Sequence, residues 1–181
     1  MKLEPLKAFW RKRLVKELPY YDGKMTQSIL CWLFTDQGDK TLVCDELAFN
    51  ERLHYRYRIL QQRYLDRDSH QAYSRLIIRL AAVLLGIPSI QVWLKQRSKS
   101  QKQLLKLIQI LVQELLDNDS NLQQRIKPIC EYTSNFHLHQ ALMLATVEEY
   151  CLEKVNNQPL LIHRFRQYLE SQLHREIEKV A

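Results

Sequence analysis

Glycine is nearly absent from this sequence: Gly23, Gly38 and Gly86 are the only three in 181 residues. Glycine supplies the tight turns of β-rich folds and the loops that cradle phosphates in nucleotide-dependent enzymes, so its scarcity argues against both classes. Strong helix formers (Leu, Gln, Arg, Lys and Glu) dominate the rest of the chain. We therefore predict an all-α protein, a multi-helix bundle without alternating strand patterns.

Apolar residues at spacings of three and four predict the first helix, Leu3 to Leu18, and Pro19 ends it. A second short helix is expected from Met25 to Phe34, followed by a loop around Gly38. We place the domain boundary in this loop. Residues 1–39 would form a helical N-terminal arm, and residues 40–181 a helical domain.

The same periodicity predicts six further helices separated by polar or proline-containing breaks. Their expected ranges are 45–65, 69–85, 89–116 with Ser98 as a second start point, 121–132, 136–153 and 159–179. Gly86 is expected to cap the helix that precedes it, and Pro88 to start the next one.

One short stretch has the spacing of a helix-turn-helix unit, which we place at about residues 72–103. Such units need a small residue where the two helices touch, glycine four positions later, an apolar residue next, and another apolar residue six positions after the glycine. Ala82, Gly86, Ile87 and Val92 meet these demands. The same spacing also fits helical hairpins that never touch DNA.

The second helix of this unit carries side chains of the kinds that read base edges and bind phosphates. The residues expected in the major groove are Gln91, Lys95, Gln96, Arg97 and Lys99. The residues expected on phosphates are Arg75, Arg79 and Lys102. Lysines at 95, 99, 102 and 106 would form one cationic ridge on a continuous helix, although such a stripe is often just a solvated face.

Charge is distributed unevenly along this basic chain, whose net charge is +7. Between Glu51 and Lys106, twelve Lys or Arg residues face three acids, whereas seven acids face three basic residues between Val112 and Leu160. The basic segment surrounds the candidate reading unit, as expected of a surface that neutralises phosphates. Tyr55, Tyr57 and Tyr64 lie among its arginines. Tyrosines in such a segment either stack on bases or line the edge of the core, and the second role is the more common one.

Catalytic, metal and membrane signatures are missing from the sequence. His137 and His139 are two residues apart and so point away from each other on a helix. The four cysteines are widely spaced without a C-x-x-C pair, which indicates reduced thiols. The longest apolar run, Leu80 to Ile87, is too short to cross a bilayer. We expect a cytoplasmic protein that is not an enzyme, with no cofactor, no metal and no membrane partner.

Several stretches resemble the cyanobacterial heterocyst-differentiation regulators of the HetZ type. They are Val147–Leu152, Asn157–Leu169, Leu60–Asp66, Ala72–Leu80 and Leu104–Leu116, so the resemblance covers roughly residues 50–170. It implies a cytoplasmic regulator of transcription that carries a helix-turn-helix, contacts promoters and binds another regulatory protein. It assigns no base-contacting residue.

The sequence thus predicts a transcriptional regulator that binds double-stranded DNA through its basic helix-turn-helix surface. We expect a homodimer, because one short helix reads few base pairs. The alternative is a non-enzymatic adaptor protein whose basic face docks an acidic regulatory partner. RNA binding is a third option, without a recognised RNA-binding module in its support.

Overall fold

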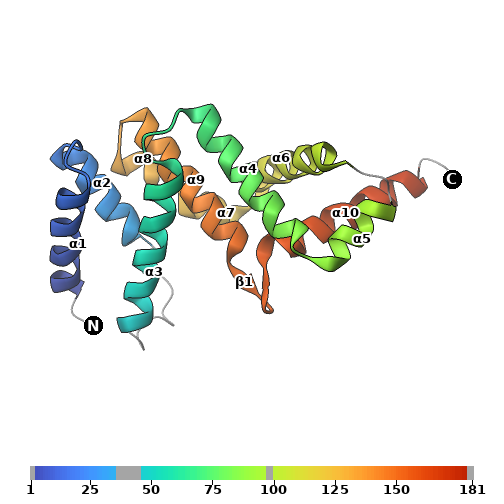
Figure 1. Cartoon of the computed structure of the whole chain (residues 1–181), viewed down its shortest axis with the longest axis horizontal. Coiled ribbons are helices and arrows are strands. Elements are labelled where there is room, and N and C mark those ends of the chain that lie inside the picture. The colour runs from blue at the N-terminus through green and yellow to red at the C-terminus, as the bar shows by residue number, and fades with distance from the viewer. Residues whose placement is uncertain (1–2, 36–45, 97–99, 179–181) are drawn as a thin grey trace. The chain divides into compact units, whose positions relative to one another are not determined.

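The computed structural model describes residues 3–35, 46–96 and 100–178 (Figure 1). Helices make up most of these residues, so the all-α prediction is confirmed. In chain order the elements are α1 Leu3–Glu17, α2 Gly23–Leu33, α3 Glu46–Ile59, the π-helical turn η2 Leu60–Tyr64, α4 Ser69–Leu85, α5 Pro88–Gln96, α6 Gln101–Asn118, α7 Ser120–Ile126, α8 Ile129–Tyr132, α9 Phe136–Leu152, β1 Lys154–Val155, β2 Gln158–Pro159 and α10 Leu160–Glu178.

The chain divides into two compact units, each built from two segments. Unit 1 comprises Met1–Ala72 and Gln124–Thr146, and unit 2 comprises Tyr73–Gln123 and Val147–Ala181. The boundary that we expected at residues 39–40 lies outside the described residues. The helices on both sides of it, α2 and α3, nevertheless belong to unit 1 and contact each other, so the expected N-terminal arm is part of a larger body.

Two buried tryptophans organise unit 1. The Trp10 indole donates from Nε1 to Asn50 Oδ1 at 3.4 Å, and its ring packs edge-on against Tyr57 with centroids 5.6 Å apart. Trp32 donates from Nε1 to the Thr146 hydroxyl oxygen at 2.9 Å inside the core. Since Trp10 belongs to α1, Trp32 to α2 and Thr146 to α9, these contacts join the N-terminal helices to the rest of the unit.

Arg56 is 3% exposed, although it belongs to the arginine-rich segment that suggested a phosphate-binding surface. Its Nη1 donates to the Leu33 carbonyl at 3.2 Å, and its guanidinium lies 4.6 Å from the Trp32 ring centroid. Tyr57 and Tyr64 are each 1% exposed, so they belong to the core and not to a base-stacking surface. Burial follows from the helical period, because these side chains share the inner side of α3 and η2.

Unit 2 contains α5, α6, α10 and most of α4. A hairpin of β1 and β2 joins α9 to α10 (Figure 1). Asn156 and Asn157 form its tip with φ of 50° and 63°, which suits a two-residue turn and the tolerance of asparagine for the left-handed region. Pro159, expected in the first turn of the last helix, instead pairs with Lys154 in the hairpin.

The other breaks between helices have local causes. Asp68 accepts a hydrogen bond from the Gln71 N–H at 3.0 Å and so caps α4. Pro128 separates α7 from α8 within the range that we expected to be one helix, 121–132.

No single helix in the described part of the chain is long and apolar enough to cross a membrane. The helices α4 and α5 pass that test only when they are taken together, as a pair bent by 95°.

The Trp32–Thr146 hydrogen bond can be tested by a double-mutant cycle. Thr146→Val keeps the side-chain volume and leaves the buried indole N–H without its acceptor, so we expect a loss of about 1–3 kcal/mol in the free energy of unfolding. In Trp32→Phe with Thr146→Val, the total loss should fall short of the sum of the single losses by at least about 0.5 kcal/mol. Urea denaturation measures all four proteins, and additive losses would contradict the coupling.

Candidate functional site

The helices α4 and α5 meet at a sharp bend of 95°, within the range of about 90–120° for helix-turn-helix units. The break between them has two residues, Gly86 and Ile87, and so is shorter than the usual turn of about three or four. The Ile87 carbonyl accepts hydrogen bonds at 3.1 Å from the N–H groups of Ile90 and Gln91, so α5 starts directly after the turn.

Gly86 directly follows the last residue of α4, where a C-terminal cap was expected, and its N–H donates to the Ala82 carbonyl at 3.1 Å. No glycine in the described residues has a positive φ, so Gly86 ends the helix without the left-handed conformation. A Cβ at Gly86 would lie 3.3 Å from the Val83 carbonyl oxygen, which is close to the lower limit of real contacts. A side chain at this position would therefore require the backbone of the preceding turn to give way by a few tenths of an ångström.

The residues expected to lock the two helices together do not all do so. Ala82 is exposed and Val92 is 51% exposed, so their assignment as interhelical contacts was wrong. Ile90 and Leu94, one helical turn apart, are the buried residues of α5. Val92 lies two residues from each of them and so falls on the other side of the helix.

An aromatic contact holds α5 within unit 2. The Trp93 ring packs edge-on against Phe165 of α10, with centroids 5.7 Å apart and planes at 87°. Together with the buried Ile90 and Leu94, this contact fixes which side of α5 faces solvent. The packing that presents α5 therefore comes partly from α10, more than sixty residues further along the chain.

Gln91, Lys95 and Gln96 are exposed on α5, as a reading surface requires. The Gln91 side chain folds back on the turn, where Nε2 donates to the Leu85 carbonyl at 2.5 Å. Lys102 is also exposed, on α6. Arg97 and Lys99 lie outside the described residues.

The continuous lysine ridge was a wrong prediction. Lys95 belongs to α5, whereas Lys102 and Lys106 belong to α6, which starts separately. A capping box at Ser100 causes the new start: its hydroxyl accepts from the Gln103 N–H at 3.3 Å, and Gln103 Oε1 accepts from the Ser100 N–H at 2.8 Å. Ser98, our expected second start point, lies outside the described residues.

The two arginines of α4 assigned to phosphates differ in their surroundings. Arg75 is exposed. The Arg79 Nε lies 3.7 Å from Oε1 of Glu148, whose side chain is fully buried. A carboxylate taken out of water needs a nearby cation, so Arg79 is at least partly committed to Glu148. No sequence pattern indicates this pair, because its two residues are far apart in the chain.

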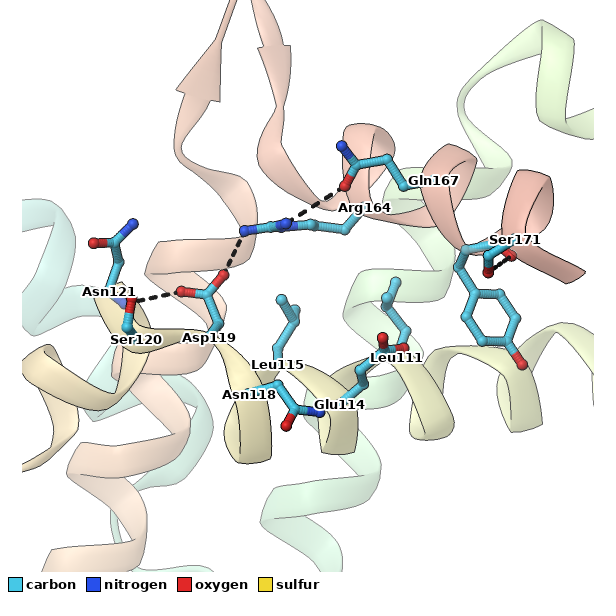
Figure 2. Close-up of a pocket in the computed structure, with 11 residues that line it drawn as sticks. Leu111, Glu114, Leu115, Asn118, Asp119, Ser120, Asn121, Arg164, Gln167 and Ser171 are labelled. Atoms are coloured by element: carbon cyan, nitrogen blue, oxygen red, sulfur yellow. Dashed lines mark hydrogen bonds and ion pairs between the residues drawn. The ribbon is translucent and has the colours of Figure 1, made fainter.

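A polar pocket of about 400 Å³ lies elsewhere in unit 2, between the end of α6 and α10 (Figure 2). Asp119 and Arg164 point toward each other in it, with Arg164 Nη2 2.5 Å from Asp119 Oδ2. Glu114, Asn118 and Gln167 are among the other residues of its wall.

Asp119 is the centre of this cluster. Its Oδ1 accepts from the N–H groups of Asn121 and Leu122, both at 3.1 Å, and from the Tyr150 hydroxyl at 2.8 Å. Burial raises the pKa of Asp119, but these hydrogen bonds and the Arg164 charge outweigh burial and lower the pKa below its ordinary value. An ionised Asp119 thus caps α7 and anchors α10.

The expected helix ranges leave Asp119 in the polar break between residues 116 and 121 and place Arg164 within the last helix, and no sequence pattern links the two. An aspartate directly before a helix is an N-cap signal, so the capping role could have been found. The partner, Arg164, is 45 residues away and carries no local signal. Because Asp119 already uses both carboxylate oxygens, the pocket resembles a structural joint more than a reaction centre.

Groups suited to catalysis or metal binding are sparse in the described residues. No set of three or more His, Cys, Asp or Glu residues there is placed to hold a metal ion. Burial, aided by the Asp119 charge, raises the pKa of the Cys151 thiol to about 12, which keeps this thiol protonated and unreactive.

Comparisons with protein-family models, characterised proteins and solved structures find no match. The resemblance to HetZ-type regulators therefore rests on the sequence stretches given above. The strongest candidate site remains the exposed side of α5, since the Asp119 pocket is occupied by its own internal contacts.

Asp119→Asn tests the joint between α7 and α10. We expect a loss of about 1–3 kcal/mol in the free energy of unfolding at neutral pH, moderated because the Arg164 side chain is 37% exposed. Since the folded-state pKa is depressed, the ionised Asp119 stabilises the fold above its ordinary pKa of 3.8 and loses this effect as the pH falls through the folded value.

Thermal unfolding between pH 7 and pH 2 checks this, with the exposed Asp117→Asn as the matched control. The Asp119 variant should lose less stability on acidification than the wild type. If the variant and the wild type lose the same stability on acidification, then Asp119 does not contribute to the pH dependence of stability.

Proposed function

We propose that this protein is a DNA-binding transcriptional regulator whose α5 approaches the major groove of duplex DNA. The observation that carries the proposal is the exposed polar side of α5, presented at the end of a helix pair that meets at 95°. A reading helix must project from its domain, and α5 leaves Gln91, Lys95 and Gln96 exposed while Ile90 and Leu94 fix it to unit 2.

The chemistry of this exposed side supports base reading. Glutamine amides pair with the N6 and N7 edge of adenine, and lysine ammonium groups with the acceptors of guanine. Val92, 51% exposed, supplies an apolar surface of the kind that contacts the thymine methyl group. The exposure of Val92, which contradicts its expected packing role, is thus consistent with a reading role.

Phosphate contacts are assigned to cations on the neighbouring helices. Arg75 of α4 and Lys102 and Lys106 of α6 are exposed, and all three belong to the same unit as α5. Arg79 is a weaker candidate than the sequence indicated, because Glu148 offsets its charge. Each phosphate neutralised by such a cation releases counterions, so we expect binding that weakens steeply with salt.

The resemblance to HetZ-type regulators supports a role in transcription, with promoter DNA and another regulatory protein as partners. At nine residues, α5 can contact few base pairs, so selective recognition would need a homodimer on two half-sites.

An adaptor protein is the second candidate, favoured by apolar exposure on α4. Ile78 is 60% exposed and Ala82 is exposed on the helix that also carries Arg75 and Arg79. Apolar and arginine side chains together are typical of protein interfaces. In this alternative, the face would dock an acidic regulatory protein and α5 would not contact DNA.

Fluorescence anisotropy of the full chain with a mixed-sequence duplex, across a salt series, tests the proposal. Lys95→Glu with Lys102→Glu should weaken binding, and the loss of the Lys102 phosphate contact should reduce the slope of log K against log salt by about 0.9. Lys12→Glu with Lys16→Glu on α1 changes the net charge equally and serves as the control.

If both double variants weaken DNA binding equally, the protein is attracted to DNA by its net charge alone. That result would reject the α5 surface as the DNA-binding site. If the wild-type protein fails to bind at low salt, where phosphate contacts are strongest, the adaptor function becomes the better proposal.

A further inference from the structure

A cavity of about 430 Å³ lies in unit 1, between α1 and the α3–η2 helix. Its wall includes Arg13, Glu51, His54, Tyr55, Tyr57 and Arg58. The volume falls in the range of about 300–1,000 Å³ that is usual for small-molecule sites. The proposed DNA surface lies in unit 2 and uses none of these residues.

Arg13 is held in one position at this cavity. Its Nε lies 2.7 Å from Glu17 Oε1, and its guanidinium carbon lies 4.9 Å from the Trp10 ring centroid and 5.3 Å from that of Tyr57. A guanidinium fixed by a carboxylate and two aromatic rings loses little freedom when a ligand binds beside it.

His54 presents a defined hydrogen-bond donor. Arg13 Nη1 lies 2.5 Å from His54 Nδ1, and because a guanidinium can only donate, Nδ1 must be the acceptor. Burial and the Arg13 charge lower the pKa of His54, although Glu17 opposes them, so the ring is neutral at neutral pH. The proton of the neutral ring then resides on Nε2, which can donate to a ligand.

Tyr57 brings a buried hydroxyl without a hydrogen-bond partner. The residue is 1% exposed, and its hydroxyl oxygen makes no hydrogen bond within the described residues. Burial and the nearby Glu17 carboxylate, which attracts the hydroxyl proton, raise the pKa of Tyr57. A buried hydroxyl left unpaired costs stability, which is what a group reserved for a ligand would show.

Arg58 and Tyr55 add a cation and a planar surface. Both are exposed, and the Arg58 guanidinium lies 5.7 Å from the Tyr55 ring centroid. In the described part of the chain, no carboxylate forms an ion pair with Arg58, whereas Glu17 balances Arg13. A guanidinium without an ion-pair partner can bind one phosphate group, and a base can stack on an exposed tyrosine ring.

We propose that this cavity binds a nucleoside monophosphate unit. The phosphate contacts Arg58, the base stacks on Tyr55, and the Tyr57 hydroxyl and His54 Nε2–H bind polar atoms of the base or sugar. Gln61 and Gln62, also in the wall, add amide groups that can pair with base edges. Glu51 is the carboxylate of the wall, and it disfavours ligands with several phosphates.

Isothermal titration calorimetry of the full chain tests this with four probes: adenosine monophosphate, adenosine, inorganic phosphate and a short single-stranded oligodeoxyadenylate. We expect the monophosphate to bind at least about tenfold more tightly than adenosine or phosphate alone, because only it reaches both the ring and the guanidinium. If the oligonucleotide binds and the monophosphate does not, the unit is recognised within a nucleic-acid strand; the reverse result identifies a free nucleotide.

Two variants locate the binding. Arg58→Gln should weaken monophosphate affinity about tenfold, whereas Arg67→Gln, an exposed arginine outside the cavity wall, should leave it unchanged. Tyr57→Phe keeps the ring in the core and removes the hydroxyl, so thermal stability should be unchanged or higher while affinity falls severalfold.

The proposal is overturned if none of the probes binds at millimolar concentration, or if Arg58→Gln and Arg67→Gln bind alike. It is also overturned if Tyr57→Phe lowers the melting temperature and leaves affinity unchanged, since the hydroxyl would then be structural. Lys95→Glu with Lys102→Glu should not alter monophosphate binding. The monophosphate proposal and the DNA proposal can therefore be rejected separately.

Discussion

A charged side chain leaves water only beside a compensating partner, and this constraint shapes both units. In unit 1, the buried Arg56 takes the Leu33 carbonyl and the Trp32 ring as partners, which holds α2 against α3. In unit 2, the buried Glu148 lies beside Arg79. Each pairing joins residues of different helices, so the placement of those helices depends on charges as well as on apolar burial.

Helical content and most helix starts were predictable, because they follow from neighbouring residues: the apolar period of α6, the Asp68 cap of α4 and the proline that begins α5. Contacts between distant segments were not. Nothing near Val92 shows that Trp93 packs on Phe165, and that contact decides which side of α5 is exposed. The capping box at Ser100 was readable in principle, since Ser and Gln stand three residues apart, and it would have corrected the continuous lysine helix.

The Lys and Arg residues of the basic segment lie in different structural environments. Arg56 is buried, Arg79 neutralises a carboxylate, and Arg58 lies at a cavity of unit 1, while Lys95 and Lys102 remain on the surface of unit 2. A count of charges along the chain therefore overstates the charge available to any one partner. What remains on unit 2 is a composite surface drawn from α4, α5 and α6, whose shape depends on helix ends and not on one long helix.

The three tryptophans of the chain are divided between the units: Trp10 and Trp32 are fully enclosed in unit 1, and Trp93 is half-buried on α5 in unit 2. Indole fluorescence shifts to longer wavelength as water reaches the ring, so the long-wavelength edge of the emission spectrum arises mainly from Trp93 of α5. A collisional quencher in solution would reach that ring first. The protein thus carries its own optical probe for each unit, and no dye is needed to follow them separately.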